Sequence, residues 1–284
     1  MNKESDSQLM TRFDDIYNLP DCRAYYKAMH ESQYSNADYA IKGFVPALNE
    51  LQRIRGLEKP LVMDFASGYG IGALLMRHYI TLEQVLDRYQ APKFMDATVE
   101  NVIKWDQQWI DQNKHVHEPC SIFGIDVADQ ALQYGQAVGI FDSVFALDLQ
   151  KEQPGEELSE LIHNCDMIIE VGSVIHLLPG ALDTILGLCG EILPWIVSSP
   201  IRGNESEESM KIMESAGLVV EAMPIPPFPH RMFMDEAEKE RATKLVEERG
   251  FDTEGFESTG SYHAQLYIAR PENECTPLEN WLDI

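Results

Sequence analysis

Short apolar runs alternate with longer amphipathic segments over most of this chain. Runs rich in β-branched and other apolar residues predict buried strands, whereas apolar positions spaced three or four apart predict helices. The predicted strands cover 61–65, 121–126, 143–148, 167–171, 195–199, 218–223 and 262–270. The predicted helices cover 70–78, 97–113, 128–138, 181–192, 205–216 and 235–250, with a further one opening at Thr81. Strands separated by helices predict an α/β fold, a seven-stranded, mostly parallel sheet with helices on both faces.

Three regions stand outside this alternation. Residues 1–57 are rich in aromatic residues and are expected to form a helical N-terminal cap or lid. Within this region, the polar residues 1–20 are expected to be partly loose. Residues 58–284 then form the α/β domain, which carries a helical insert at about 80–118. A proline cluster at 224–229 breaks regular structure and opens a segment, about 224–260, that is expected to contact the substrate. Loops and additions at the ends of the strands are where such folds place specificity.

The first strand ends in a turn of small residues. Its sequence is Asp64-Phe65-Ala66-Ser67-Gly68-Tyr69-Gly70-Ile71-Gly72. Small residues allow the backbone to approach a ligand closely, and the N–H groups that open the next helix attract an anionic group. The carboxylate of Asp64 can accept hydrogen bonds from an ammonium group. The turn therefore suits a ligand that contains a free amino acid.

The next three strands also end in acidic residues, and ligands of parallel sheets bind at these strand ends. Asp126 follows the second strand, and a carboxylate there can accept hydrogen bonds from two ribose hydroxyls. Asp148 ends the third strand and Glu170 lies in the fourth. The gap between Asp64 and Asp126 is far longer than the roughly 20 residues typical of nucleotide-binding patterns. The predicted insert accounts for this excess.

Together these strand ends resemble the cofactor site of class I S-adenosylmethionine (SAM)-dependent methyltransferases, and the resemblance implies SAM as cofactor. It implies that Asp64, Ala66, Ser67, Gly68, Tyr69 and Gly70 surround the methionine end of SAM. It further implies Asp126 and Val127 at the ribose, Asp148 and Leu149 at the adenine, and Glu170 to His176 near the methyl group. Ala66 stands where the family usually has glycine, a change that keeps the position small.

Over most of its length the chain also resembles one bacterial subgroup of these enzymes. This resemblance is carried by Gly68-Tyr69-Gly70-Ile71, the stretches 75–78 and 81–82, Phe228-Pro229-His230-Arg231-Met232-Phe233 and Tyr262-His263-Ala264-Gln265-Leu266-Tyr267. The subgroup shares no single assigned acceptor. The resemblance therefore implies the fold and cofactor and leaves the acceptor open.

Two other functions fit part of the pattern. Gly68 to Ala73 also matches the dinucleotide pattern Gly-x-Gly-x-x-Gly/Ala of nicotinamide-dependent oxidoreductases, with Asp87 as the later acidic residue. However, Asp87 falls in a predicted helix rather than at a strand end. A non-catalytic protein that retains SAM, or serves as a partner subunit, would carry the same motifs.

The candidate acceptor residues lie outside the minimal fold. His230 and His176 are candidate general bases, although a packing histidine is the commoner case. Arg231 could provide a cation for an anionic acceptor group or merely pair with a surface carboxylate. Tyr26, Tyr34 and Ser173 are candidate wall residues. We expect methyl transfer to a small molecule by in-line displacement, with no obligatory catalytic triad.

The charge narrows the choice of partners. The formal net charge is −25 and the pI is about 4.5, so phosphate backbones and anionic membrane surfaces are disfavoured. The five cysteines are scattered without a Cys-x-x-Cys pair, and His115-x-His117-Glu118 fits a solvated loop, so we expect no metal site. The first residues lack an apolar signal segment, which favours a cytoplasmic protein. The oligomeric state stays open, and a homodimer is compatible with the sequence.

Overall fold

A computed structural model describes residues 14–117, 119–172 and 178–282 of the chain. Its strands are β1 (Leu61–Phe65), β2 (Ser121–Asp126), β3 (Ser143–Ala146), β4 (Met167–Glu170), β5 (Trp195–Ser198), β6 (Leu218–Ala222), β7 (Phe228–Met232), β8 (Ser261–Ala264) and β9 (Tyr267–Pro271). The α-helices are α1 (Asp14–Tyr17), α2 (Arg23–Glu31), α3 (Asn36–Arg55), α4 (Ile71–Arg77), α5 (Leu82–Arg88), α6 (Val99–Gln112), α7 (Asp129–Ala137), α8 (Glu156–His163), α9 (Pro179–Leu188), α10 (Glu207–Ser215) and α11 (Glu236–Glu248). Short 3₁₀ helices are η2 (Pro92–Phe94), η3 (Glu257–Thr259), η4 (Glu272–Glu274) and η5 (Leu278–Asn280).

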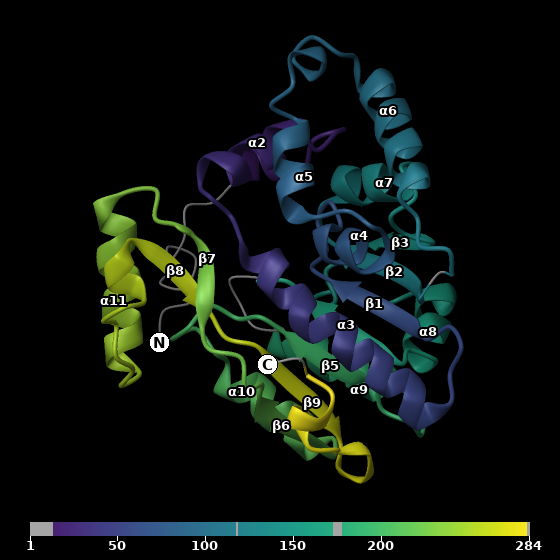
Figure 1. Ribbon diagram of the computed structural model, residues 1–284. Coiled ribbons are helices and arrows are strands. Elements are labelled where there is room, and N and C mark those ends of the chain that lie inside the picture. Colours follow the sequence, from purple (N-terminus) through teal and green to yellow (C-terminus); the bar gives the residue numbers. More distant parts are fainter. Residues whose placement is uncertain (1–13, 118, 173–177, 283–284) are drawn as a thin grey trace.

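Seven strands form the central sheet in the order β3-β2-β1-β4-β5-β9-β6 (Figure 1). Pairs β3–β2, β2–β1, β1–β4 and β4–β5 are parallel, whereas β9 runs antiparallel to both β5 and β6. An antiparallel strand inserted next to the last parallel strand distinguishes this sheet from the parallel dinucleotide-binding order 3-2-1-4-5-6. The chain has the Rossmann-like class I methyltransferase fold, as the strand pattern and motifs predict.

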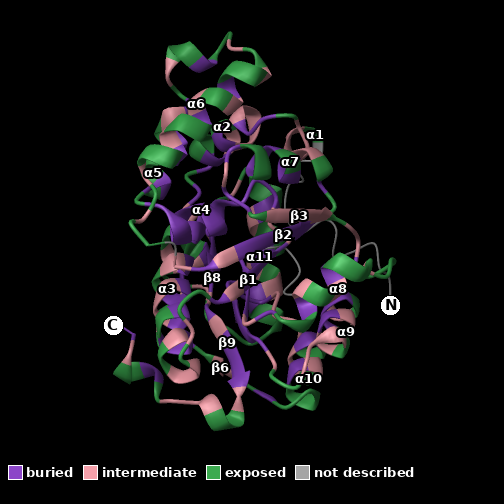
Figure 2. Ribbon diagram, turned by 90° about the vertical axis from the view of Figure 1, so that its right-hand side faces the viewer, coloured by how far each residue is buried: buried purple, intermediate pink, exposed green. Residues whose placement is uncertain are grey.

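Helices cover both faces of this sheet. Because successive strand residues point to opposite faces, each central strand contributes side chains to two cores. On β1, Val62 belongs to a core cluster with α2, α3, α4 and α7, while Met63 and Phe65 belong to a second cluster with α8, α9 and α10. The central strands β1, β2, β4 and β5 are buried almost throughout, and the helices are exposed on their outer sides (Figure 2). The double covering explains why the central strands read as continuous apolar runs rather than as alternating ones.

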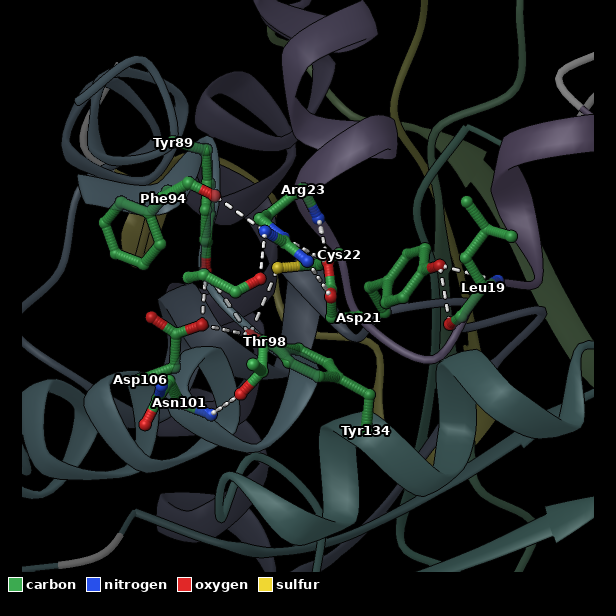
Figure 3. A network of polar contacts seen from close by, with 12 residues as sticks. Leu19, Asp21, Cys22, Arg23, Tyr89, Phe94, Thr98, Asn101, Asp106 and Tyr134 are labelled. Atoms are coloured by element: carbon green, nitrogen blue, oxygen red, sulfur yellow. Dashed lines mark hydrogen bonds and ion pairs between the residues drawn. The ribbon is translucent and has the colours of Figure 1, made fainter. Parts of the chain in front are cut away.

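The N-terminal helices and the insert are joined by a buried polar network (Figure 3). At its centre is Asp106 of α6, which is fully buried. Its carboxylate accepts hydrogen bonds from Arg88 Nε at 2.7 Å, the Tyr134 hydroxyl at 2.8 Å and the Tyr89 hydroxyl at 3.2 Å. Cys22, just before α2, donates from Sγ to the Tyr134 hydroxyl at 3.1 Å. The predicted insert is therefore fastened to α2 and α7.

A second, two-stranded sheet lies beside the main one and differs from the prediction. The predicted single strand at 262–270 is wrong, because the chain there divides into β8, which pairs with β7, and β9, which enters the main sheet. The predicted irregularity of the proline cluster ends earlier than expected, since Pro229 lies within β7. Proline is tolerated there because β7 is an edge strand with a register shift at Pro229/Arg231. Helix α11 packs against β8 and is joined to β7 by the ion pair of Glu238 with Arg231.

Two further elements were missing from the predictions. Helix α8 fills the stretch between β3 and β4, with Leu158 and Ile162 buried under an acidic outer face. The short helix α1 and the residue after it contact the end of β2 and α7 through Tyr17 and Asn18. Among the described helices, none is long and apolar enough to span a membrane.

Candidate functional site

The turn after β1 is built from backbone conformations that favour glycine. Gly68 and Gly70 have φ of +51° and +78°, and Ala66 has φ of +54°. A non-glycine residue in this left-handed region costs about 1–2 kcal/mol. Ala66 therefore occupies a position where glycine would avoid this cost. The alanine that stands in place of the family's usual glycine is small enough to fit, but its backbone conformation is less favourable. The turn lies at the ends of β1 and β2, where Ser67 N–H donates to the carbonyl oxygen of Ile125.

Asp126, at the end of β2, is joined directly to this turn. Its Oδ2 accepts a hydrogen bond from Gly68 N–H at 2.8 Å, and its Oδ1 accepts one from Ala128 N–H at 2.9 Å. Burial raises the pKa of Asp126, and these two N–H groups oppose the rise. The sheet thus brings Asp126 and the glycine turn together, although the insert separates them in sequence.

Asp64 lies inside β1 and is fully enclosed. Its Oδ2 accepts a hydrogen bond from Ala73 N–H, in the first turn of α4, at 3.3 Å. Burial raises the pKa of Asp64 to about 8, and the neighbouring carboxylates of Asp126 and Glu170 contribute to the rise. A carboxyl group in this state gains from a cation beside it, because the cation restores its ionised form.

The N-terminal segment covers this turn, and the contact is made by Tyr17, which was not among the predicted site residues. The Tyr17 hydroxyl donates to Asp126 Oδ2 at 3.5 Å. A β-carbon placed on Gly68 would lie 2.3 Å from that hydroxyl, so Tyr17 sits directly over the glycine. Asn18 accepts from Gln130 N–H at 2.8 Å, and Leu19 N–H donates to the Tyr69 hydroxyl at 3.0 Å. Tyr17 is thus a candidate site residue that lies outside the sequence motifs.

Three further cofactor candidates lie just beyond the ends of β2 and β3. Val127 is 68% exposed beside Asp126, an unusual position for a large apolar side chain next to a buried strand. Asp148 instead binds Lys151, whose Nζ donates to Oδ2 at 2.6 Å, and this contact lowers the pKa of Asp148. Leu149 is buried in the core cluster under α9. Of the three, Val127 has the most surface available to a ligand.

A second group of polar residues gathers at the ends of β4 and β5. Glu170 ends β4 and Ser199 follows β5, and both are fully buried. Asn36 opens α3 and donates from Nδ2 to Ser199 Oγ at 3.1 Å. His230 of β7 approaches from the other side, with Nε2 3.4 Å from the carbonyl oxygen of Gly172. Asn36 and Ser199 were not predicted, although Ser199 carries the same strand-end signal as Asp126.

The wall residue Tyr34 belongs to this group as well. Its ring contacts the His230 ring edge-on, with centroids 5.4 Å apart. Burial raises the pKa of Tyr34 well above its usual value, and among smaller effects the Asn36 amide lowers it and the Glu170 carboxylate raises it. The predicted residues Tyr34, Glu170 and His230 therefore lie together.

Other predicted acceptor residues lie elsewhere. Arg231 is fully buried and forms a two-pronged ion pair with Glu238 of α11, at 2.7 and 3.1 Å. This corrects the expectation of a surface carboxylate partner, and the guanidinium charge is already balanced. Tyr26 stacks on Tyr89 within the aromatic packing of α2 and the insert, with ring centroids 5.4 Å apart.

The candidates Ser173 and His176 lie outside the described residues. Within the described part of the chain, no group of three or more His, Cys, Asp or Glu residues is placed to hold a metal ion.

No known protein-family model and no curated protein matches this chain. Solved structures match its fold. A geranyl diphosphate methyltransferase in complex with SAM is 12% identical, with 92% of this chain and 96% of that chain covered and a TM-score of 0.44. The plantazolicin methyltransferase, in complex with a desmethyl analogue and S-adenosylhomocysteine (SAH), is 10% identical, with 91% and 97% covered and a TM-score of 0.41. A TehB-like SAM-dependent methyltransferase from Corynebacterium glutamicum is 14% identical, with 77% and 85% covered and a TM-score of 0.36. The fold assignment above rests on the strand order, because similarities this distant carry no argument about function.

Proposed function

We propose that this protein is a SAM-dependent methyltransferase that acts on a small-molecule acceptor. The observation that carries the proposal is the contact between the β1 turn and the β2 end, where Asp126 Oδ2 accepts from Gly68 N–H. This contact lies at the carboxyl ends of neighbouring parallel strands, where ligands of such sheets bind.

The residues present fit SAM. The amino-acid part of SAM has an ammonium group, which suits the buried carboxyl group of Asp64. The ribose hydroxyls would take the place of the Tyr17 hydroxyl on Asp126, and the adenine would cover the exposed face of Val127. When bound, SAM supplies a methyl group on a positively charged sulfur. The protein's part is to hold the acceptor in line and to exclude water.

The dinucleotide alternative loses support from the same geometry. Asp87, its candidate ribose residue, lies on α5 with a side chain 66% exposed and is 3.6 Å from His30. The glycine turn instead meets Asp126. A non-catalytic SAM-binding protein would share this geometry, and the buried polar group at Asn36, Glu170 and His230 favours an enzyme because a second ligand could bind there.

The N-terminal residues 1–57 serve in this proposal as the lid, since Tyr17 covers the cofactor turn and Asn36 reaches the acceptor group. Residues 224–260 contribute His230. The insert at 80–118 supports α2 through Arg23, which donates to the carbonyl oxygens of Phe94 and Ala97, and supports α7 through Asp106. The acidic surface supports a small acceptor over nucleic acid.

Activity can be tested by following SAH release from SAM across a panel of small molecules. The matched control is Gly68→Val, whose side chain would displace Tyr17 and fill the turn. We expect release with at least one compound by the wild type and none by the variant. Binding of SAM without turnover of any acceptor would support the non-catalytic alternative.

A further inference from the structure

The polar group at the ends of β4 and β5 is assembled by backbone contacts between distant segments. Ser35 N–H donates to the carbonyl oxygen of His230 at 2.8 Å, and Met232 N–H donates to that of Ser32 at 2.8 Å. The segment before α3 therefore runs along β7. A β-carbon on Gly172, which has φ of +65°, would lie 2.2 Å from Asn36 Nδ2 and 2.7 Å from His230 Nε2. The side chains of Asn36 and His230 are thus close neighbours with only a glycine between them.

The hydrogen-bond directions leave the oxygen of Asn36 without a donor. Ser199 Oγ lies 3.5 Å from the carbonyl oxygen of Glu170, to which only its hydroxyl hydrogen can be directed. Asn36 must then donate from Nδ2 to Ser199 Oγ, as the 3.1 Å contact shows. Its Oδ1 is buried and has no hydrogen-bond partner. An unsatisfied buried acceptor costs about 1–3 kcal/mol, and most proteins avoid it.

The same reasoning applies to His230. A carbonyl oxygen can only accept, so the Nε2 that faces Gly172 carries the hydrogen. Burial lowers the pKa of His230 to about 3, with a further contribution from Arg231, so the imidazole is neutral near pH 7. Nδ1 then has a bare lone pair, and it too is buried without a partner. The register shift of β7 falls at this residue, and such bulges often direct a side chain toward a site.

Both unsatisfied atoms are therefore hydrogen-bond acceptors, and the charges nearby are mainly negative. The carboxylate of Glu170 acts on both Tyr34 and Asp64. The nearest cation, Arg231, is balanced by Glu238. A carboxylate or phosphate offers no donor to these atoms and would be repelled. A hydroxyl offers a single hydrogen, whereas a primary amine offers two and its ammonium form three.

We propose that the acceptor is an amine, whose N–H groups donate to Asn36 Oδ1 and His230 Nδ1. This inference rests on the proposed function, because it assumes that the polar group is the acceptor site. It replaces the anionic acceptor group that the presence of Arg231 suggested. It also gives the strongly acidic composition a role, since a negative surface attracts cationic compounds to the protein.

The test uses pairs of probes with the same hydrocarbon part, ethylamine against propionate and benzylamine against phenylacetate. Each is titrated into ¹⁵N-histidine-labelled protein, with and without saturating SAH, while the Nδ1 resonance of His230 is followed. We expect the amines to shift this resonance and the acids to leave it unchanged. Calorimetry of SAH alone reports on the proposed function, so failure of the cofactor and failure of the amine site are distinguishable.

Variants show whether the named atoms make the contact. His230→Phe keeps a ring in place while removing the Nδ1 lone pair, and Asn36→Ala removes Oδ1. Each should weaken amine binding at least about tenfold, the scale of one hydrogen bond to a charged group. The control is His263→Phe, on the neighbouring strand β8, which should bind amines as the wild type does. If Asn36→Ala does not fold, His230→Phe decides alone. Tighter binding of the acids, unchanged amine affinity in His230→Phe, or no response of Nδ1 to either amine would overturn the proposal.

Discussion

Removal of the Asp126 carboxylate is the substitution whose effect on SAM binding can be worked most fully from the structure. Oδ1 is committed to Ala128 N–H, whereas Oδ2 is shared by Gly68 N–H and the Tyr17 hydroxyl. The 3.5 Å contact to Tyr17 is the longest of the three and the one that ribose hydroxyls would replace. Asp126→Ala should therefore remove the charge-assisted bonds to the ribose, worth about 1–3 kcal/mol. That corresponds to a Kd for SAM roughly 5-fold to 150-fold higher.

The loss of a negative charge must be separated from the loss of these contacts. Asp129→Ala removes the same charge from the start of α7, where the exposed carboxylate accepts only from Asn18 Nδ2, at 3.0 Å, among the contacts described. Calorimetric titration with SAM at fixed pH and ionic strength measures both variants, and circular dichroism checks that each is folded. We expect Asp129→Ala to bind SAM within about twofold of the wild type. The reasoning fails if folded Asp126→Ala binds SAM like the wild type, or if both variants weaken it equally.

Three other substitutions test separate parts of the account. Tyr17→Phe removes a hydroxyl that competes for Asp126, so SAM affinity should stay equal or rise by less than about 1 kcal/mol; a tenfold loss by calorimetry would instead make the hydroxyl a direct ligand. Asp106→Ala leaves buried donors without their acceptor, so chemical denaturation should show a loss of about 3–5 kcal/mol, whereas Asp111→Ala on the same helix, in an exposed ion pair, should cost less than about 1 kcal/mol; equal losses would contradict the network. The pKa of Asp64 in the unliganded protein is raised to about 8. Protonated Asp64 therefore favours the folded state most below pH 4, and this contribution to the free energy of unfolding is lost as the pH rises toward 8. Between pH 5 and 7 the unfolding free energy of the wild type should therefore fall more steeply than that of Asp64→Asn, by about 1.4 kcal/mol per pH unit; parallel curves would show that Asp64 ionises normally.

The central strands and the cofactor turn could be predicted because their signals are local. Buried parallel strands are short apolar runs, and Asp64, Gly68 and Asp126 lie at or just beyond the ends of these runs. The capping box at Thr81 was likewise local, and both of its hydrogen bonds are present. The split of 262–270 was not predictable in this way, since the bend at Gln265 is fixed by contacts with Met223 and Ile225.

The acceptor group depended on tertiary structure that no local pattern records. Asn36 comes near His230 only because the segment before α3 pairs with β7. Tyr17 reaches Asp126 from a polar stretch without periodicity. The role of Arg231 was left open between an acceptor-binding cation and a surface ion pair, because Glu238, its buried partner, lies beyond a turn on the next helix. Pairings of this kind follow from packing rather than from spacing along the chain.

The claim on which the account depends most is that the β1–β2 turn binds SAM, and calorimetric titration of the wild type with SAH tests it most directly. The titration should be run near pH 7 in two buffers with different heats of ionisation. We predict saturable one-to-one binding with release of up to about one proton, because the ammonium group of SAH would ionise Asp64, whose pKa in the unliganded protein is about 8. Nicotinamide dinucleotides should give no binding heat under the same conditions. Saturable binding of a nicotinamide dinucleotide with no binding of SAH would contradict the account.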